Sequence, residues 1–222
     1  MKYEIGILML NTSFHRPIGD IGNPGTYSFP VAFEVVDQAT IQRVVKDGDF
    51  SLIEPFIQGA KVLQNKNVKA ITTSCGFLAL FQKEIQRELS VPFYSSSLIQ
   101  IPMANILTGG TVGVITARKA SLTYKHLQGV NAHKTPIVIE GMDNMPAFSS
   151  AIIDETGPLN MDAVALEMKQ VTLRLLESNP RITAIVLECT NMPPYRNAIK
   201  EVTNLPIFDI NTLTNYALSS FQ

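Results

Sequence analysis

The sequence predicts an α/β fold built from two similar halves. Along its 222 residues, short apolar runs rich in β-branched residues alternate with longer amphipathic stretches, and this alternation is typical of strand–helix–strand units. A strand that ends in a cysteine and is followed by a helix and an X-Pro strand occurs twice. Cys189 follows Cys75 by 114 positions, and Pro206 follows Pro92 by the same interval. The agreement of the two intervals favours an internal duplication over a chance likeness of two βα units.

The candidate strands are nearly continuous apolar runs, the pattern of strands that are buried on both faces of a parallel sheet. In chain order they are residues 4–10, 68–73, 92–94, 111–116, 136–140, 182–187 and 206–209. The first and fourth of them also match each other, because IGIL at residues 5–8 resembles VGVI at residues 112–115. This second match extends the duplication toward the start of each half.

The stretches between the strands have the apolar periodicity of helices. They are residues 52–65, 78–89, 98–107, 122–127, 161–176, 195–202 and 212–220. Residues 12–31 fit neither pattern and are rich in glycine and proline. A loop of this length is often a lid or a binding loop, although a surface excursion without a role fits equally well. A second irregular stretch, residues 141–158, is expected to flank the same site from the other half.

Composition excludes several classes of protein. With 45% hydrophobic and 17% charged residues, the chain is expected to be compact and globular. A net charge of −1 lacks the electrostatic footprint of a nucleic-acid or membrane-surface binder. No apolar run approaches the ~18 residues of a membrane span, and the opening apolar run does not resemble a signal peptide. A soluble, cytoplasmic protein is therefore expected, and composition leaves open whether it forms a homo-oligomer.

The two cysteines stand where α/β sheets bind ligands, at the carboxyl ends of their strands. Each also precedes a helix, whose free N–H groups lower the pKa of a nearby thiol. If the two halves face each other about a pseudo-twofold axis, the thiols face each other across a cleft. A disulfide is disfavoured in a cytoplasmic chain, and no C-x-x-C redox motif is present. The alternative is that both cysteines are small buried core residues.

Two opposed thiols suit the inversion of a stereocentre next to a carbonyl group. One thiolate removes a proton from one face, and the other thiol returns a proton to the opposite face, so no organic cofactor is required. Backbone N–H groups after the cysteines, with Ser74 and Thr190 nearby, would stabilise negative charge on the carbonyl oxygen. The three histidines are scattered without the spacing of metal ligands, so no metal site is expected.

The cysteine motifs, TSCG at residues 73–76 and LECTN at residues 187–191, resemble those of the aspartate/glutamate/hydantoin racemase superfamily. The resemblance covers essentially the whole chain. It implies two pseudosymmetric lobes, each a parallel four-stranded sheet flanked by helices, with a cofactor-independent site at the lobe interface and Cys75 and Cys189 as its acid/base residues. The first lobe is expected at residues 1–108, completed by the last helix at 210–222, and the second at residues 109–209.

The motifs also depart from those of the amino-acid racemases. In that family Asn-Thr typically follows the first cysteine, where this chain has Gly76-Phe77, and glutamate racemases have histidine where this chain has Asn191. These differences favour a hydantoin-like or amino-acid-derived substrate in a more apolar pocket. The predicted substrate-binding residues are Asn11, Ser74, Gly76, Phe77, Thr116, Thr190 and Asn191. For Asn11 and Thr116, a local role at the end of a strand fits equally well.

The main prediction is a PLP-independent isomerase, a racemase or epimerase that acts next to the carbonyl or carboxylate of a small molecule. One alternative is the chemistry of superfamily members that use a cysteine for decarboxylation or cis–trans isomerisation. Another is a non-catalytic homologue that binds a small molecule. Glu188 is expected either to orient the neighbouring thiol or to point to the other face of its strand. The sequence leaves open the substrate and which cysteine acts on which enantiomer.

Overall fold

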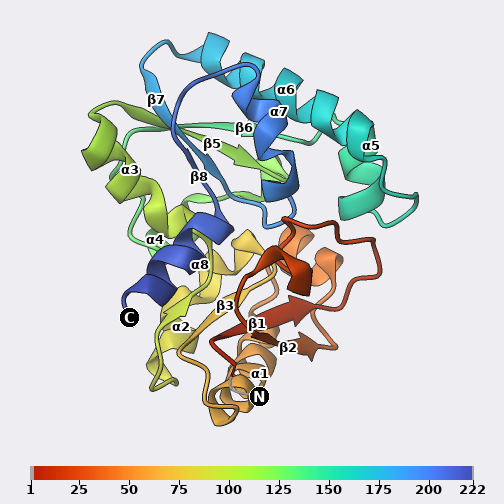
Figure 1. Ribbon diagram of the computed structural model, residues 1–222, viewed down its shortest axis with the longest axis vertical. Coiled ribbons are helices and arrows are strands. Elements are labelled where there is room, and N and C mark those ends of the chain that lie inside the picture. The colour runs from red at the N-terminus through yellow and green to blue at the C-terminus, as the bar shows by residue number, and fades with distance from the viewer. Residues whose placement is uncertain (1–2, 222) are drawn as a thin grey trace.

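The computed structural model describes residues 3–221 and contains two separate parallel sheets (Figure 1). The strands are β1 (Ile5–Leu10), β2 (Val31–Val36), β3 (Ala70–Thr73), β4 (Phe93–Tyr94), β5 (Thr111–Thr116), β6 (Ile137–Gly141), β7 (Ile182–Leu187) and β8 (Ile207–Phe208). The first sheet has the order β2-β1-β3-β4 and the second the order β6-β5-β7-β8. The two orders are the same within each half, so the predicted α/β fold with two similar parallel four-stranded sheets is confirmed.

Helices surround both sheets (Figure 1). They are α1 (Ile53–Asn65), α2 (Gln82–Arg87), α3 (Ile101–Thr108), α4 (Tyr124–Gly129), α5 (Pro146–Phe148), α6 (Met161–Ser178), α7 (Arg196–Lys200) and α8 (Ile210–Ser219). Each of the seven predicted helices has a counterpart, but the one expected at 78–89 begins as a 3-10 helix, Gly76–Phe81, before α2. Within residues 3–221, no helix combines the length and the apolar character that a membrane crossing requires.

The strand β2 was not predicted, because its residues do not form a continuous apolar run. It is an edge strand that pairs with β1, with Ile5 opposite Val31 and Leu10 opposite Val36. An edge strand leaves part of its side chains in solvent, and Val35 is accordingly 50% exposed. Glu34 in the middle of the strand removes the apolar signal that marks the buried strands.

The two lobes exchange helices. The helix α8 follows the last strand of the second sheet but packs on the first, where Ile210 and Leu213 share a buried cluster with Ile5. The helix α3 follows the last strand of the first sheet but contacts β5 and β7 of the second. At its end the hydroxyl oxygens of Thr108 and Thr183 are 2.7 Å apart. Each lobe is therefore covered in part by a helix from the other half of the duplication.

The carboxyl ends of β3 and β7 lie next to each other at the interface between the two lobes. The candidate site therefore lies at this interface. Cys75 and Cys189 each come two residues after the end of their strand. The hydroxyl of Thr190 in the second lobe donates a hydrogen bond of 2.6 Å to the carbonyl oxygen of Ser74 in the first. The hydroxyl of Ser97 donates in the same way to the carbonyl oxygen of Leu187. These two hydrogen bonds join the lobes beside Cys75 and Cys189, and they fix the relative position of the two thiols.

Candidate active site

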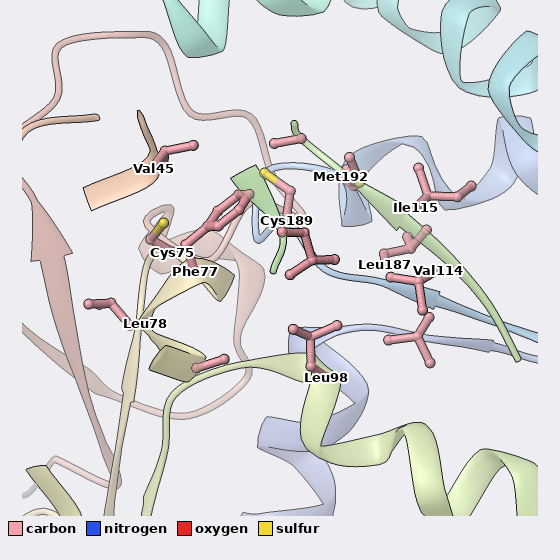
Figure 2. Packing of buried hydrophobic residues seen from close by; sticks show 14 of the residues in the cluster. Val45, Cys75, Phe77, Leu78, Leu98, Val114, Ile115, Leu187, Cys189 and Met192 are labelled. Atoms are coloured by element: carbon pink, nitrogen blue, oxygen red, sulfur yellow. The ribbon is translucent and has the colours of Figure 1, made fainter. Parts of the chain in front are cut away.

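A cavity lies between the lobes, and both cysteines line it. Figure 2 shows the two sulfur atoms with the ring of Phe77 between them in this view. Both thiols are free, and each cysteine is 8% exposed. The predicted meeting of Cys75 and Cys189 at the lobe interface is therefore what the fold produces. Among residues 3–221, no group of three or more His, Cys, Asp or Glu residues is arranged to hold a metal ion.

Four of the seven predicted substrate-binding residues line this cavity, namely Ser74, Gly76, Phe77 and Asn191. The other three lie outside its lining. Asn11 is exposed, and its side-chain amide donates to the carbonyl oxygen of Asp37 at 3.0 Å. Thr116 is buried and donates to the Glu188 carboxylate at 2.8 Å. Thr190 is buried in its bond to Ser74. The hydroxyls of Thr116 and Thr190 thus bind Glu188 and Ser74, which line the cavity, and do not line it themselves.

The environment of Cys75 contains groups that favour its thiolate. Burial raises the pKa of the Cys75 thiol, and the carboxylate of Glu188 raises it further. The backbone N–H groups of Phe77 and Leu78 and the charge of Arg16 act in the opposite direction. These N–H groups belong to the first turn of the 3-10 helix Gly76–Phe81, for which Cys75 is the N-cap. A helix start therefore faces the first thiol, as the sequence indicated.

The environment of Cys189 favours the protonated thiol. Burial raises the pKa of Cys189 well above its ordinary value, and the negative charges of Glu188 and Asp20 add to the effect. The thiol donates to the side-chain oxygen of Asn191 at 3.3 Å. The side-chain nitrogen of Asn191 in turn donates to Asp20 at 2.7 Å, which keeps the amide oxygen turned toward the sulfur. Burial and Glu188 thus raise the pKa of both thiols, and the difference between them is that the charge of Arg16 acts on Cys75.

The long loop brings to the cavity an ion pair between the partly buried Arg16 and the buried Asp20. Arg16 lines the cavity, and its guanidinium donates to Asp20 at 2.8 Å and to Thr12 at 2.8 Å. Its central carbon lies 4.4 Å from the centroid of the Phe14 ring. Asp20 is 1% exposed and also accepts the backbone N–H of Gly22 at 2.7 Å. This pair was not predicted, and the one available signal is an arginine and an aspartate four positions apart in a loop without a helical pattern.

Glu188 faces the cavity rather than the other side of its strand. Its side chain is fully buried, and one carboxylate oxygen accepts the hydroxyl of Thr116 at 2.8 Å and the backbone N–H of Ala117 at 3.3 Å. Burial raises the pKa of Glu188 to about 7, against the effect of these two hydrogen bonds. A carboxyl group that changes charge near neutral pH therefore stands beside both thiols.

The second irregular stretch contributes to the cavity from the other lobe. Ile152 and Ile153 line it and belong to a single turn of π-helix, Ser149–Ile153. The residues that follow contact the first lobe, since Asp154 pairs with Lys46 at 3.1 Å and Glu155 accepts the backbone N–H of Ser13 at 2.6 Å. Residues 141–158 therefore flank the site, as the sequence indicated.

The fold is shared with solved structures of other proteins. No family model matches the sequence. The structure of glutamate racemase from Francisella tularensis superposes with a TM-score of 0.61 at 20% identity over 99% of this chain and 81% of that one. A putative Asp/Glu racemase from Yersinia pestis gives 0.64 at 15% identity over 98% of both chains, and unliganded arylmalonate decarboxylase gives 0.56 at 14% identity over 92% and 86%. The chain therefore shares the fold of these racemases and of arylmalonate decarboxylase.

The curated relatives point to another activity. The chain is 27% identical to a dimethylsulfoniopropionate lyase of Durusdinium sp. clade D over 98% of this chain and 75% of that protein. Dimethylsulfoniopropionate lyases 7 and 3 of Emiliania huxleyi (strain CCMP1516) are 27% and 29% identical over 99% of this chain, and over 67% and 60% of their own lengths. These relatives support an enzyme rather than a non-catalytic binding protein.

The same finding overturns the prediction of a racemase or epimerase, because the curated relatives are named as lyases and not as isomerases. It fits better the alternative in which a cysteine serves decarboxylation or cis–trans isomerisation. That alternative named decarboxylation, which breaks a carbon–carbon bond, and arylmalonate decarboxylase is among the similar structures. The isomerase prediction was wrong because opposed thiols beside a carbonyl suit any reaction that begins with removal of an α-proton.

Proposed function

We propose that this chain is a carbon–sulfur lyase that eliminates dimethyl sulfide from dimethylsulfoniopropionate or a closely related sulfonium carboxylate. The observation that carries the proposal is a cavity that combines two buried thiols with a partly buried arginine, in a chain similar over nearly its whole length to dimethylsulfoniopropionate lyases. A thiol is suited to removing the α-proton, and an arginine is suited to binding the carboxylate.

Arg16 is the proposed partner of the substrate carboxylate. Its contacts to Asp20 and Thr12 hold the guanidinium at the cavity wall, and its planar fork suits a carboxylate. Pairing with a cation withdraws negative charge from the carboxylate, which makes the α-proton more acidic. The same arginine favours the thiolate of Cys75. Arg16 would thus bind the substrate carboxylate and also favour the thiolate of Cys75.

Cys75 is the proposed base, because the charge of Arg16 and the N–H groups of Phe77 and Leu78 favour its thiolate, against the burial and the Glu188 charge that raise the pKa of both thiols. The Cys75 thiolate takes a proton from the carbon next to the carboxylate. The electrons of that C–H bond form the carbon–carbon double bond, and the bond from the β-carbon to sulfur breaks with its electron pair on sulfur. The products are acrylate, neutral dimethyl sulfide and a proton that returns from Cys75 to solvent. The thiol of Cys189 stays protonated during this step and donates its hydrogen bond to Asn191.

The test is direct assay of the purified chain with dimethylsulfoniopropionate. Dimethyl sulfide is measured in the gas phase by chromatography and acrylate by nuclear magnetic resonance. We expect both products in equal amounts, and no product from a variant in which Cys75 and Cys189 are both serine. Absence of dimethyl sulfide, or equal release by the double variant, would contradict the proposed reaction.

The substitution Arg16→Lys is expected to raise KM for dimethylsulfoniopropionate by roughly ten- to a hundredfold, with a smaller effect on kcat. Lysine keeps a positive charge beside Asp20 but loses the planar fork, and a hydrogen bond to a charged group contributes about 1.5–3 kcal/mol. Steady-state kinetics measure the effect. The matched control is Arg174→Lys, because Arg174 is exposed and pairs with Glu140 outside the cavity. An unchanged KM for Arg16→Lys would remove Arg16 from substrate binding.

A further inference from the structure

One of the two carboxylate oxygens of Glu188 has no hydrogen-bond partner among residues 3–221. Its Oε2 atom accepts the hydrogen bonds from Thr116 and Ala117. Its Oε1 atom is buried and has no hydrogen-bond partner within residues 3–221. This oxygen lies against Gly76, since a Cβ atom placed on Gly76 would come within 2.3 Å of it. Both Gly76 and Glu188 line the cavity, so this unpaired carboxylate oxygen is buried at the cavity wall between the lobes.

A carboxylate in this position opposes the chemistry of the thiols. It raises the pKa of both Cys75 and Cys189, and a reaction that needs a thiolate is slower when the thiolate is harder to form. A buried carboxylate also has a large desolvation cost when nothing pairs with it. A cationic group in the cavity would remove both disadvantages, because it would neutralise Glu188 and lower the pKa of the thiols.

The surroundings of Glu188 suit a cation with an apolar surface. Phe77 lines the cavity together with the two cysteines, and its ring is drawn between their sulfur atoms in the view of Figure 2. An aromatic face attracts alkylated cations. The edge of His126 against Phe77, with ring centroids 5.4 Å apart, holds the ring in place. Apolar side chains, among them Val45 and Ile153, complete this part of the lining. A methylated cation could therefore replace its water shell with a carboxylate and an apolar wall.

We propose that Glu188 binds the positively charged leaving group of the substrate, so that the cavity selects carboxylates that carry a methylated cation on the β-carbon. This inference rests on the proposed function and adds a specificity-determining contact to it. Arg16 and Glu188 place opposite charges on the walls of one cavity, and this pair of charges matches the two ends of a zwitterion. A neutral thioether carboxylate of the same shape would leave Glu188 unpaired and would bind more weakly.

The proposal predicts how binding depends on pH. The titratable or charged groups around Glu188 come from both lobes and are Cys75, Cys189, Arg16, Asp20 and, behind Phe77, His126. Burial lowers the pKa of His126 to about 4 and raises the pKa of both thiols. Glu188, with its pKa at about 7, loses its proton as the pH rises through neutrality. Binding of a cationic ligand should therefore strengthen over that range.

Two unreactive ligands that have the same shape but differ in the charge at the β-position test whether this charge controls binding. They are 3-(trimethylammonio)propanoate, which is cationic at the β-position, and 4,4-dimethylpentanoate, its neutral isostere. Calorimetry gives their Kd values at about pH 5.5 and about pH 8.5, on either side of the pKa of Glu188. At the higher pH we expect the cationic ligand to bind about tenfold tighter or more, as for a charged pair in a buried site. At the lower pH we expect this preference to shrink toward unity.

The substitution Glu188→Gln keeps the shape of the side chain and removes its charge. We expect the preference for the cationic ligand to disappear at both pH values, whereas the exposed control Glu177→Gln keeps it. The ratio of two Kd values within one variant is insensitive to a partial loss of folded protein, and the pH series on the unaltered chain needs no substitution at all. Equal binding of the two ligands at the higher pH, an unchanged ratio in Glu188→Gln, or no binding of the cationic ligand would overturn the proposal.

The proposed function can fail separately from this inference. If no dimethyl sulfide is released but the Glu188-dependent preference is present, the cavity still selects β-cationic carboxylates and another reaction must be sought. If dimethyl sulfide is released and the preference does not depend on Glu188, the lyase assignment stands and the role of Glu188 is wrong.

Discussion

Replacement of Cys75 by serine is expected to lower kcat for dimethyl sulfide release by about 10²–10⁴-fold, the range over which a positioned general base contributes. A serine hydroxyl occupies nearly the same volume but does not ionise at neutral pH. The α-proton would then have no base on its side of the cavity. Steady-state release of dimethyl sulfide measures the loss, and substrate deuterated at the α-carbon shows whether proton removal limits the rate of the unaltered chain.

Replacement of Cys189 by serine is expected to cost less, because a serine hydroxyl can still donate a hydrogen bond to Asn191 or to the substrate. The comparison also has a control in Met142→Leu, which replaces a buried sulfur in the second lobe outside the cavity lining. A larger loss for Cys189→Ser than for Cys75→Ser would exchange the proposed roles of the two thiols. Full activity in both variants would exclude cysteine chemistry altogether.

The substitution Gly76→Ala is expected to reduce both stability and activity. A Cβ atom at Gly76 would come within 2.2 Å of the carbonyl oxygen of Glu188 and within 2.3 Å of its Oε1 atom. The carboxylate can rotate away, but the carbonyl belongs to the backbone of the other lobe and cannot. The lobes would have to move apart at the site. Overpacking of this kind costs about 1–3 kcal/mol, occasionally more, and the separation of the thiols would change with it.

Denaturant unfolding measures the stability of Gly76→Ala, and the dimethyl sulfide assay measures its activity. The matched control is Gly157→Ala, where the nearest atoms to an added Cβ are 3.6 Å away. We expect the control to stay within about 0.5 kcal/mol of the unaltered chain, as surface substitutions usually do. A stable and active Gly76→Ala variant would contradict the close approach of the two lobes at this glycine.

Much of this architecture was predictable because buried parallel strands leave a continuous apolar run in the sequence. The strands β3 and β7 are such runs, and the cysteine that follows each of them indicates from the sequence alone where the site lies. The edge strand β2 was missed for the same reason, since Glu34 and the exposed Val35 interrupt the apolar signal. Local pattern therefore predicted the central strands and the edge strands β4, β6 and β8, and it failed at the edge strand β2, whose apolar run is interrupted.

The polar residues of the site were harder to predict, because their roles depend on contacts across long intervals of sequence. Asp20 and Asn191 lie 171 positions apart and are joined by a hydrogen bond of 2.7 Å. No periodicity connects them. Thr116 and Asn11 were expected near the substrate from their places at strand ends, but their side chains turn to Glu188 and to Asp37. The position at a strand end is visible in sequence, whereas the direction of the side chain is not.

The sequence by itself determined the α/β fold with two similar halves and the place of the two thiols after β3 and β7. Only the tertiary structure decided that Arg16 and Glu188 join the thiols in one cavity, and that the two thiols have unequal surroundings. The physical reason is that strand burial is a local property of consecutive side chains, and it can be read along the chain. The charge of a cavity is set instead by residues from separate segments, and it exists only once the lobes have closed on each other.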